Sequence, residues 1–281
     1  MSCGFLAEVA CLWEATARKV GNVHPSRSFG DLEYMQFVMS AAAIRPMFES
    51  ADERPVGKLV LEAVEATRNR VASNTNLGIL LMLAPLASSR PLDEVLATLS
   101  IEDAECVYRA IRLANPGGLG DAPEQDVRDA PTVTLLEAMK LAADRDLIAR
   151  QYANGFADVF DFGVPAFLDA FAKFGSVEAA IVDSQLRWMA KFPDSLIARK
   201  NGPAVAEDVR RRAAAALELG GIATAEGRAA GVALDGHLRS DGNKLNPGTT
   251  ADLIAACLFV ALRENKIAPS APFRWNAPDW V

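Results

Sequence analysis

The sequence contains few of the residues from which metal centres and disulfide frameworks are built. It has only two histidines, His24 and His237, and its four cysteines stand alone with no C-x-x-C pair. Zinc knuckles, His-rich metal sites and a readable disulfide framework are therefore excluded, and a Ser/His or Cys/His catalytic pair could use only those two histidines. Hard cations bound by carboxylates remain possible, because the chain has 36 Asp and Glu residues.

The sequence also has no excess of positive charge and no long hydrophobic run. Lys and Arg number 29 against 36 Asp and Glu, and the net charge of −7 argues against binding to nucleic acid or to anionic membranes. The longest apolar stretches, residues 77–87 and 253–262, are shorter than the roughly 20 residues that span a bilayer. The N-terminal residues lack the basic region of a signal peptide, so we expect a cytoplasmic protein.

Alternating runs of β-branched residues are absent, and helical patterns take their place. Hydrophobic residues make up 51% of the chain, and Ala and Leu recur at spacings of three and four. This pattern predicts an all-α fold, and nothing alternates between strand and helix as a Rossmann-type sheet would require. The expected helices span residues 5–18, 32–50, 56–72, 134–160, 164–173 and 177–191, with an amphipathic helix over residues 205–217.

Two of the predicted helices, residues 77–87 and 251–262, are apolar on nearly all sides. A helix of this kind must be surrounded by other helices, so these two are expected at the centre of the bundle. No linker, composition shift or internal repeat divides the chain, which predicts a single domain over residues 1–281. Residues 268–281 form a tail, and we expect its Trp275 and Trp280 to pack onto the body or onto a second subunit, which allows a homodimer.

A stretch rich in glycine and proline lies between Asn115 and Pro131. Loops of this length are usually lids, binding loops or disordered segments. Within it, Gly117-Gly-Leu-Gly120 follows no strand and opens no clear helix. It can be a weak phosphate-binding loop or a flexible connector.

Polar residues gather at four places, and the first is the region from Glu14 to Phe37. Glu14 and Arg18 have the i, i+4 spacing of a helical ion pair, and Gly21 is placed to end that helix. Asp31 is placed to cap the next helix or to lie in its first turn. These local roles leave residues 22–25, Asn-Val-His-Pro, without an explanation.

The second and third places are the start of a buried helix and a proline-bounded turn. Asn74-Thr-Asn76 offers three hydrogen-bonding side chains where one would suffice as a cap, and a helix N-terminus can also bind an anion. In the turn, Asp194 is followed by Arg199 and Lys200. These charges could hold a metal-bound phosphate, or they could form a solvated helix end.

The fourth place, residues 243–252, leads into the second buried helix. Thr249 and Asp252 have the spacing of a capping box, which is a purely structural role. However, Asp252 begins an apolar helix, where an unpaired charge would be costly. We therefore expect its carboxylate to be partnered by backbone amides or by a cation.

At these same places the sequence resembles the triphosphoribosyl-dephospho-CoA synthase family. The motifs are specific only in combination, and they extend over most of the chain. They are Glu14 to Ser40, Asn74-Thr-Asn-Leu-Gly78, Leu83-Ala-Pro-Leu86, Pro116-Gly-Gly-Leu-Gly120, Asp146-Leu-Ile-Ala-Arg-Gln-Tyr152, Asp194-Ser-Leu-Ile-Ala-Arg-Lys200 and Asn246-Pro-Gly-Thr-Thr-Ala-Asp252.

The resemblance implies an all-helical enzyme that moves the 5-triphosphoribosyl unit of ATP to a ribose hydroxyl of 3′-dephospho-CoA and releases adenine. The sequence departs from citrate-lyase members at two points. Phe29-Gly-Asp31-Leu-Glu-Tyr-Met35 stands where Gly-Ala-His-x-Asp-Met is expected, and Asn76-Leu77 stands where a His-Lys pair is expected. The form is more similar to a branch from organisms that make tetrahydromethanopterin, so the acceptor can be dephospho-CoA or a pterin-type cofactor precursor.

The chemistry implied by the resemblance also suggests roles for the polar residues. Inversion at the ribose carbon calls for a single displacement, in which a carboxylate takes the proton of the attacking hydroxyl and Mg²⁺ neutralises the triphosphate. A nucleotide-binding protein without turnover remains an alternative. The hypothesis assigns Asp194 as general base, Asp31 and Asp252 as further catalytic residues and Mg²⁺ ligands, and Lys19, Asn22, His24, Asn74, Asn76, Arg199, Lys200 and Asn246 as substrate-binding residues.

Overall fold

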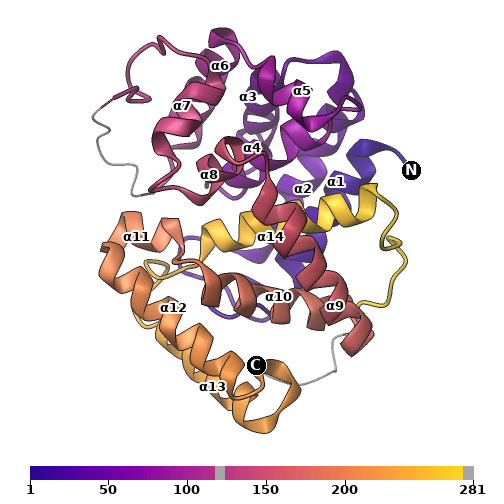
Figure 1. Cartoon of the computed structure of the whole chain (residues 1–281), viewed down its shortest axis with the longest axis vertical. Coiled ribbons are helices and arrows are strands. Elements are labelled where there is room, and N and C mark those ends of the chain that lie inside the picture. The colour runs from indigo at the N-terminus through magenta and orange to yellow at the C-terminus, as the bar shows by residue number, and fades with distance from the viewer. Residues whose placement is uncertain (118–123, 275–281) are drawn as a thin grey trace.

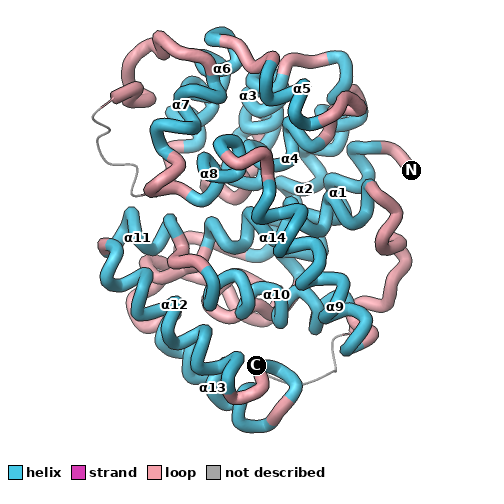
Figure 2. Tube along the Cα trace, in the orientation of Figure 1, coloured by secondary structure: helices cyan, strands magenta, loops and turns pink. Residues whose placement is uncertain are grey.

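The computed structural model describes residues 1–117 and 124–274, and fourteen α-helices account for most of them (Figure 1). In this described part of the chain, Figure 2 shows helices joined by loops and no strand, which confirms the predicted all-α class. The helices are α1 (Cys3–Thr16), α2 (Tyr34–Glu49), α3 (Val56–Arg68), α4 (Leu77–Leu86), α5 (Leu92–Ala97), α6 (Ile101–Ala114), α7 (Leu135–Ala142), α8 (Leu147–Ala153), α9 (Val164–Phe174), α10 (Val177–Lys191), α11 (Ser195–Asn201), α12 (Pro203–Glu218), α13 (Ala225–Leu238) and α14 (Gly248–Arg263).

The two helices expected at the centre, α4 and α14, are indeed buried along nearly their whole length. Every residue of α4 except Gly78 is buried, and so are twelve residues of α14. The two helices pack against each other, and α14 also packs on α1, α9 and α10. Their apolar surface therefore forms the core on which the surrounding helices rest.

Helix α10 connects the two buried clusters of the molecule. Its Ile181 and Trp188 belong to the cluster built on α4 and α14, and its Val182 and Leu186 belong to a second cluster with α12 and α13. The amphipathic stripe predicted over residues 205–217 turns its Val209 and Ala213 into that second cluster. Helix α10 is therefore covered on both sides. It spans residues 177–191, as predicted.

The single helix predicted over residues 134–160 is wrong. The chain forms α7 and α8 instead, followed by a short π-helix over Asp158–Gly163. The side chain of Asp146 starts α8 by accepting hydrogen bonds from the amides of Ile148 and Ala149. The backbone then turns left-handed at Gly155 and Phe156, which ends that helix.

Two of the expected local caps are also wrong. Helix α1 ends at Thr16 with Ala17 as its C-cap, so Gly21 lies in the following turn and does not end the helix. Asp31 does not begin α2, because Glu33 is its N-cap and forms a capping box with Gln36. Asp31 is therefore left in the loop, where its side chain can take another role.

The predicted capping box at α14 is replaced by a contact from far along the chain. Thr249 makes no cap, and its hydroxyl instead accepts a hydrogen bond from Ser195 at 3.0 Å. The buried carboxylate of Asp194 accepts from the amide and hydroxyl of Thr250 through one oxygen, at 2.7 and 2.8 Å. Its other oxygen accepts from the amides of Leu196 and Ile197, so one carboxylate caps the starts of both α11 and α14.

The described part of the C-terminal tail packs back onto α10. The carbonyl of Pro272 accepts a hydrogen bond from the amide of Val177 at 2.9 Å, and Ala271 contacts the core. Trp275 and Trp280, on which the homodimer prediction rests, lie outside the described residues. Among the described residues, no helix is both long enough and apolar enough to cross a membrane.

Removing the Asp194 carboxylate should destabilise the fold strongly. Asp194→Ala should lower the free energy of unfolding by about 1–4 kcal/mol, because two helix caps worth about 0.5–2 kcal/mol each are lost together. Asp194→Asn should lose roughly half as much, since one acceptor oxygen remains. Urea denaturation of both variants checks this, with exposed Asp169 on α9 changed to Ala as the control. An Asp194→Ala variant as stable as that control would contradict the double cap.

Candidate active site

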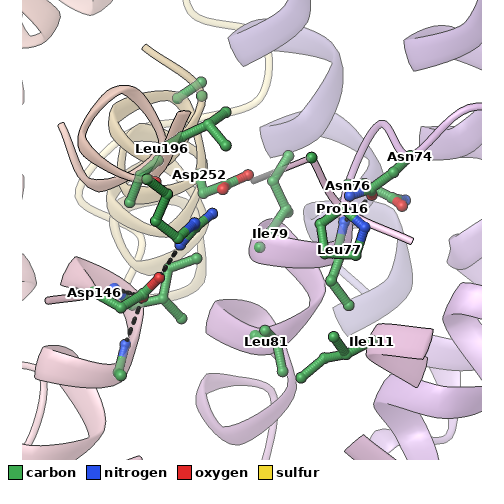
Figure 3. A pocket seen from close by; sticks show the side chains of 18 of the residues that line it. Asn74, Asn76, Leu77, Ile79, Leu81, Ile111, Pro116, Asp146, Leu196 and Asp252 are labelled. Atoms are coloured by element: carbon green, nitrogen blue, oxygen red, sulfur yellow. Dashed lines mark hydrogen bonds and ion pairs between the residues drawn. The ribbon is translucent and has the colours of Figure 1, made fainter. Parts of the chain in front are cut away.

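A cavity of about 700 Å³ opens among the starts of the two central helices and the turns around them. One part of its wall comes from the loop before α4 and from α6, α7 and α8. The opposite part comes from α11, the start of α14 and the loop between α1 and α2. Figure 3 shows Asn74 and Asn76 on one side and Leu196 and Asp252 on the other. Asp146, at the start of α8, lies on the side of Leu196 and Asp252. A cavity of this volume lies within the range of small-molecule sites.

The three polar residues before α4 all line the cavity, but only one of them caps the helix. The Asn74 side-chain oxygen accepts from the amide of Leu77 at 3.1 Å. Thr75 and Asn76 fix the loop instead, through hydrogen bonds to Ser40 and Thr67 at 2.6 and 3.0 Å. The NH₂ group of Asn74 has no partner among the described residues, so it is free to donate to a ligand.

Asp252 projects from the first turn of α14 against the first turn of α4. A Cβ atom at Gly78 would collide with its Oδ2 atom, so this close approach requires a glycine. Within residues 1–117 and 124–274 the Asp252 carboxylate has no hydrogen-bond or ion-pair partner. Burial and the negative charge of Glu14 raise the pKa of Asp252 well above its ordinary value. The site thus contains an acid whose proton affinity is raised by its surroundings, as is common for groups at functional sites.

The acid beside Asp252 is held by a buried lysine. Glu14 lines the cavity and is paired with Lys19 at 2.9 Å, and the Lys19 ammonium also donates to the Glu14 carbonyl. The predicted pairing of Glu14 with Arg18 is wrong, because Arg18 reaches Glu178 of α10 at 2.7 Å. Lys19 is fully buried and does not line the cavity. Its ammonium group therefore contacts Glu14 rather than the cavity.

Two cations reach the cavity from α11. The Arg199 side chain is bonded to Asp146, and its buried Nε atom has no hydrogen-bond partner among the residues that the structure describes. The Lys200 ammonium lies 3.3 Å from the carbonyl oxygen of Asn243, and burial lowers the pKa of Lys200. Asp31 accepts a hydrogen bond from the Asn243 side chain. Lys200, Asn243 and Asp31 therefore lie together at one end of the cavity.

Asn22 and Asn246 form the connection between the loop after α1 and the start of α14. The Asn22 amide donates to Oδ1 of Asn246 at 2.6 Å, and its oxygen accepts from Gln185 at 2.7 Å. Both groups of Asn22 are thus engaged, whereas the NH₂ group of Asn246 has no partner in the described part of the chain. Asn22 accordingly orients Asn246, and both residues line the cavity.

Three of the predicted site residues lie outside the cavity wall, namely Lys19, His24 and Asp194. His24 is fully buried, and burial together with the charge of Arg239 lowers its pKa to about 3, so the ring is neutral at pH 7. Asp194 is buried as well, and both of its carboxylate oxygens accept hydrogen bonds from helix amides or from Thr250. The structure brings the other eight together around the cavity, which are Asn22, Asp31, Asn74, Asn76, Arg199, Lys200, Asn246 and Asp252.

Asp146 and Asn243 are cavity residues to which the sequence pattern gave no role. A signal for Asp146 was present, because Asp146-Leu-Ile-Ala-Arg150 resembles Asp194-Ser-Leu-Ile-Ala-Arg199, and both aspartates cap the helix that follows. Arg199 at the end of the second motif pairs with the aspartate that starts the first. No comparable pattern marks Asn243.

The residues present could bind a cation only together with a ligand. In residues 1–117 and 124–274, no group of three or more His, Cys, Asp or Glu side chains is placed to hold a metal ion. Mg²⁺ bound to a nucleotide needs only one or two carboxylates, because phosphate oxygens and water complete its coordination. The unpartnered carboxylate of Asp252 and the loop carboxylate of Asp31 meet that lower requirement.

Comparison with known proteins shows the family to which this chain belongs. Residues 2–270 match the family model described as ATP:dephospho-CoA triphosphoribosyl transferase. A relative from Pseudomonas putida, named as a 2-(5″-triphosphoribosyl)-3′-dephosphocoenzyme-A synthase, is 37% identical over 113 residues, which cover 40% of this chain and 40% of that protein. A relative of the same name from Pseudomonas syringae pv. syringae is 28% identical, over 76% of this chain and 69% of that protein.

A solved structure agrees with the sequence relatives. A protein from Archaeoglobus fulgidus, named as a triphosphoribosyl-dephospho-CoA synthase, superimposes with a TM-score of 0.63 and 32% identity. The similarity covers 80% of this chain and 97% of that one. With the family model matched over nearly the whole chain, the protein belongs to the ATP:dephospho-CoA triphosphoribosyl transferase family.

Proposed function

We propose that the protein transfers the 5-triphosphoribosyl unit of ATP to a ribose hydroxyl of 3′-dephospho-CoA and releases adenine. The observation that carries this proposal is the unpartnered carboxylate of Asp252, which shares one cavity with the cations of Arg199 and Lys200. The family description and the names of the relatives support the same reaction. All of those names give dephospho-CoA as the acceptor, and a pterin acceptor finds no support among them.

In this reaction Asp252 accepts the proton of the attacking hydroxyl. The bond between ribose C1 and adenine N9 breaks through an oxocarbenium-like state while the hydroxyl attacks from the opposite face. A carboxylate with a raised pKa is a stronger base than an ordinary aspartate and suits this step. Asp194, the base expected from the sequence, has its oxygens committed to the starts of α11 and α14. We assign it to positioning Arg199 and Asp252.

The triphosphate is bound at the end of the cavity where Lys200, Arg199 and Asp31 gather. A free triphosphate carries about four negative charges, which these cations and Mg²⁺ together neutralise. Asp31 would hold the Mg²⁺ ion together with phosphate oxygens, while Asp252, the second carboxylate within the cavity, serves as the base. When bound, the ion supplies charge neutralisation. The free NH₂ groups of Asn74 and Asn246 are then available to the ribose or to the base.

Changing Asp252 to Asn should abolish most of the activity without preventing ATP binding. The change keeps the shape of the side chain but removes the proton acceptor, and acid–base catalysis is worth about 10²–10⁴-fold. We expect adenine release to fall by at least about 100-fold, as measured by chromatography, while ATP still raises the melting temperature. Asp169→Asn on α9 is the matched control. Near-normal adenine release by Asp252→Asn would exclude this base.

The pH dependence of the reaction should report the environment of Asp252. The base works only when it is deprotonated, so activity should be lost as the pH falls through its raised pKa. Glu14→Gln removes a nearby negative charge, which lowers the pKa of Asp252 and should move the acid limb of kcat/KM to lower pH. Glu8→Gln, on the surface of the same helix, should leave the limb unmoved. An unmoved limb in Glu14→Gln would contradict the assignment.

Lys200 should contribute to binding of the triphosphate of ATP rather than to binding of its adenine. Lys200→Met should raise the KM for ATP by about tenfold or more, because a hydrogen bond to a charged group is worth about 1.5–3 kcal/mol. Lys244→Met, which removes a nearby exposed lysine, should change KM less than twofold. Steady-state kinetics on both variants measures this. Equal effects of the two changes would place the triphosphate elsewhere.

A further inference from the structure

The cavity has a second end whose wall is aliphatic. Helices α4, α6 and α7 line it with apolar side chains, and Figure 3 shows Leu81 and Ile111 facing each other there, away from Asp252. The larger members of this wall are Leu81, Val107, Ile111, Leu135, Met139 and Leu141. The triphosphate site leaves this end without a ligand.

Small residues keep this aliphatic end open. Ala138 and Ala142 lie one turn apart on α7 and both line the cavity, with Ala149 of α8 beyond them. Leu141, between the two alanines, is 43% exposed although it is a large apolar residue. An exposed leucine in the wall of an apolar cavity is typical of a surface that a ligand covers.

The segment that begins at Glu124 is fixed against the same end. The Tyr108 hydroxyl of α6 donates to the carbonyl of Gln125 at 2.8 Å, and Arg112 donates to the carbonyl of Val127. Of the charged residues that line the cavity nearby, Asp126 pairs with Arg128 at 2.8 Å, Arg145 donates to the carbonyl of Leu141, and Glu124 is exposed. The half-buried cations Arg199 and Lys200 lie at the other end.

The chemistry of this end fits a flexible chain without charge. Apart from Tyr108, which is 4% exposed and whose hydroxyl is bonded to the Gln125 carbonyl, the larger residues that α4, α6 and α7 contribute to this wall are aliphatic. They offer dispersion contacts and little aromatic surface on which a purine would stack. The aromatic ring of Phe37 lies instead on the other side, close to Glu14 and Asn76. Of the two substrates of the proposed reaction, only dephospho-CoA carries a long uncharged arm.

We propose that the aliphatic end of the cavity, between α4, α6 and α7, binds the pantetheine arm of dephospho-CoA. The inference rests on the proposed function for the identity of the acceptor. It assigns acceptor selection to Ile111, Ala138 and Leu141, which take no part in the transfer itself. The reacting ribose of the acceptor then lies between this end and Asp252.

Calorimetric titration with one ligand at a time tests this assignment without turnover. The ligands are dephospho-CoA, ADP, which is dephospho-CoA without its arm, and ATP. Leu141→Asp should weaken dephospho-CoA binding about tenfold or more and change the affinities for ADP and ATP less than twofold. Ala138→Leu, which fills the space without adding charge, should have the same selective effect. Leu113→Asp on α6 is the matched control, because Leu113 is 38% exposed and lies outside the cavity wall.

Equal weakening of the binding of all three ligands would overturn the assignment. A loss confined to ATP binding would also overturn it, because it would place the adenine of ATP at this end. Unchanged dephospho-CoA affinity in both variants would overturn it as well. Adenine release after mixing ATP, Mg²⁺ and dephospho-CoA separates this result from the proposed function. A selective loss of dephospho-CoA binding without adenine release would refute the transfer and leave the arm site standing. Adenine release together with unchanged dephospho-CoA affinities in the variants would support the transfer and refute the arm site.

Discussion

The buried carboxylate of Asp194 is the contact on which the geometry of the site depends. It accepts hydrogen bonds from the first turns of α11 and α14, two helices whose first residues lie more than fifty positions apart in the chain. Because both helices start at the same carboxylate, the cations at the end of α11 and the Asp252 side chain on α14 reach the same cavity. A residue that contacts no ligand thereby determines where the charged ones lie.

The opposing environments of the charged groups explain how one cavity can serve a highly charged donor and a long uncharged acceptor. Asp252 lies against Gly78 with no partner among the described residues and with Glu14 nearby, so its proton affinity is raised, whereas Lys200 and Arg199 concentrate positive charge at one end. The wall of the other end is formed mainly by aliphatic side chains of α4, α6 and α7. An overall net charge of −7 conceals this local separation.

Much of the fold could be predicted from the sequence, because the burial of α4 and α14 follows from residues that are apolar on every side. The boundaries failed where a side chain within the predicted helix starts a new helix or where the backbone turns left-handed, as at Asp146 and Phe156. Local spacing likewise suggested a Glu14–Arg18 pair and a Thr249 cap, but Arg18 pairs with the distant Glu178 and the distant Asp194 caps α14. Eight of the site residues could be predicted from their polar character, whereas the aliphatic end of the cavity depends on how α6 and α7 pack and leaves no local pattern.

The most direct test of the account is the dependence of adenine release on the acceptor. ATP and Mg²⁺ are incubated with the protein, with and without dephospho-CoA, and adenine and the triphosphoribosylated product are quantified by chromatography and mass spectrometry. The account predicts that the two products form in equal amounts and only when dephospho-CoA is present. Adenine release that does not depend on dephospho-CoA, or no release while ATP binds, would contradict it.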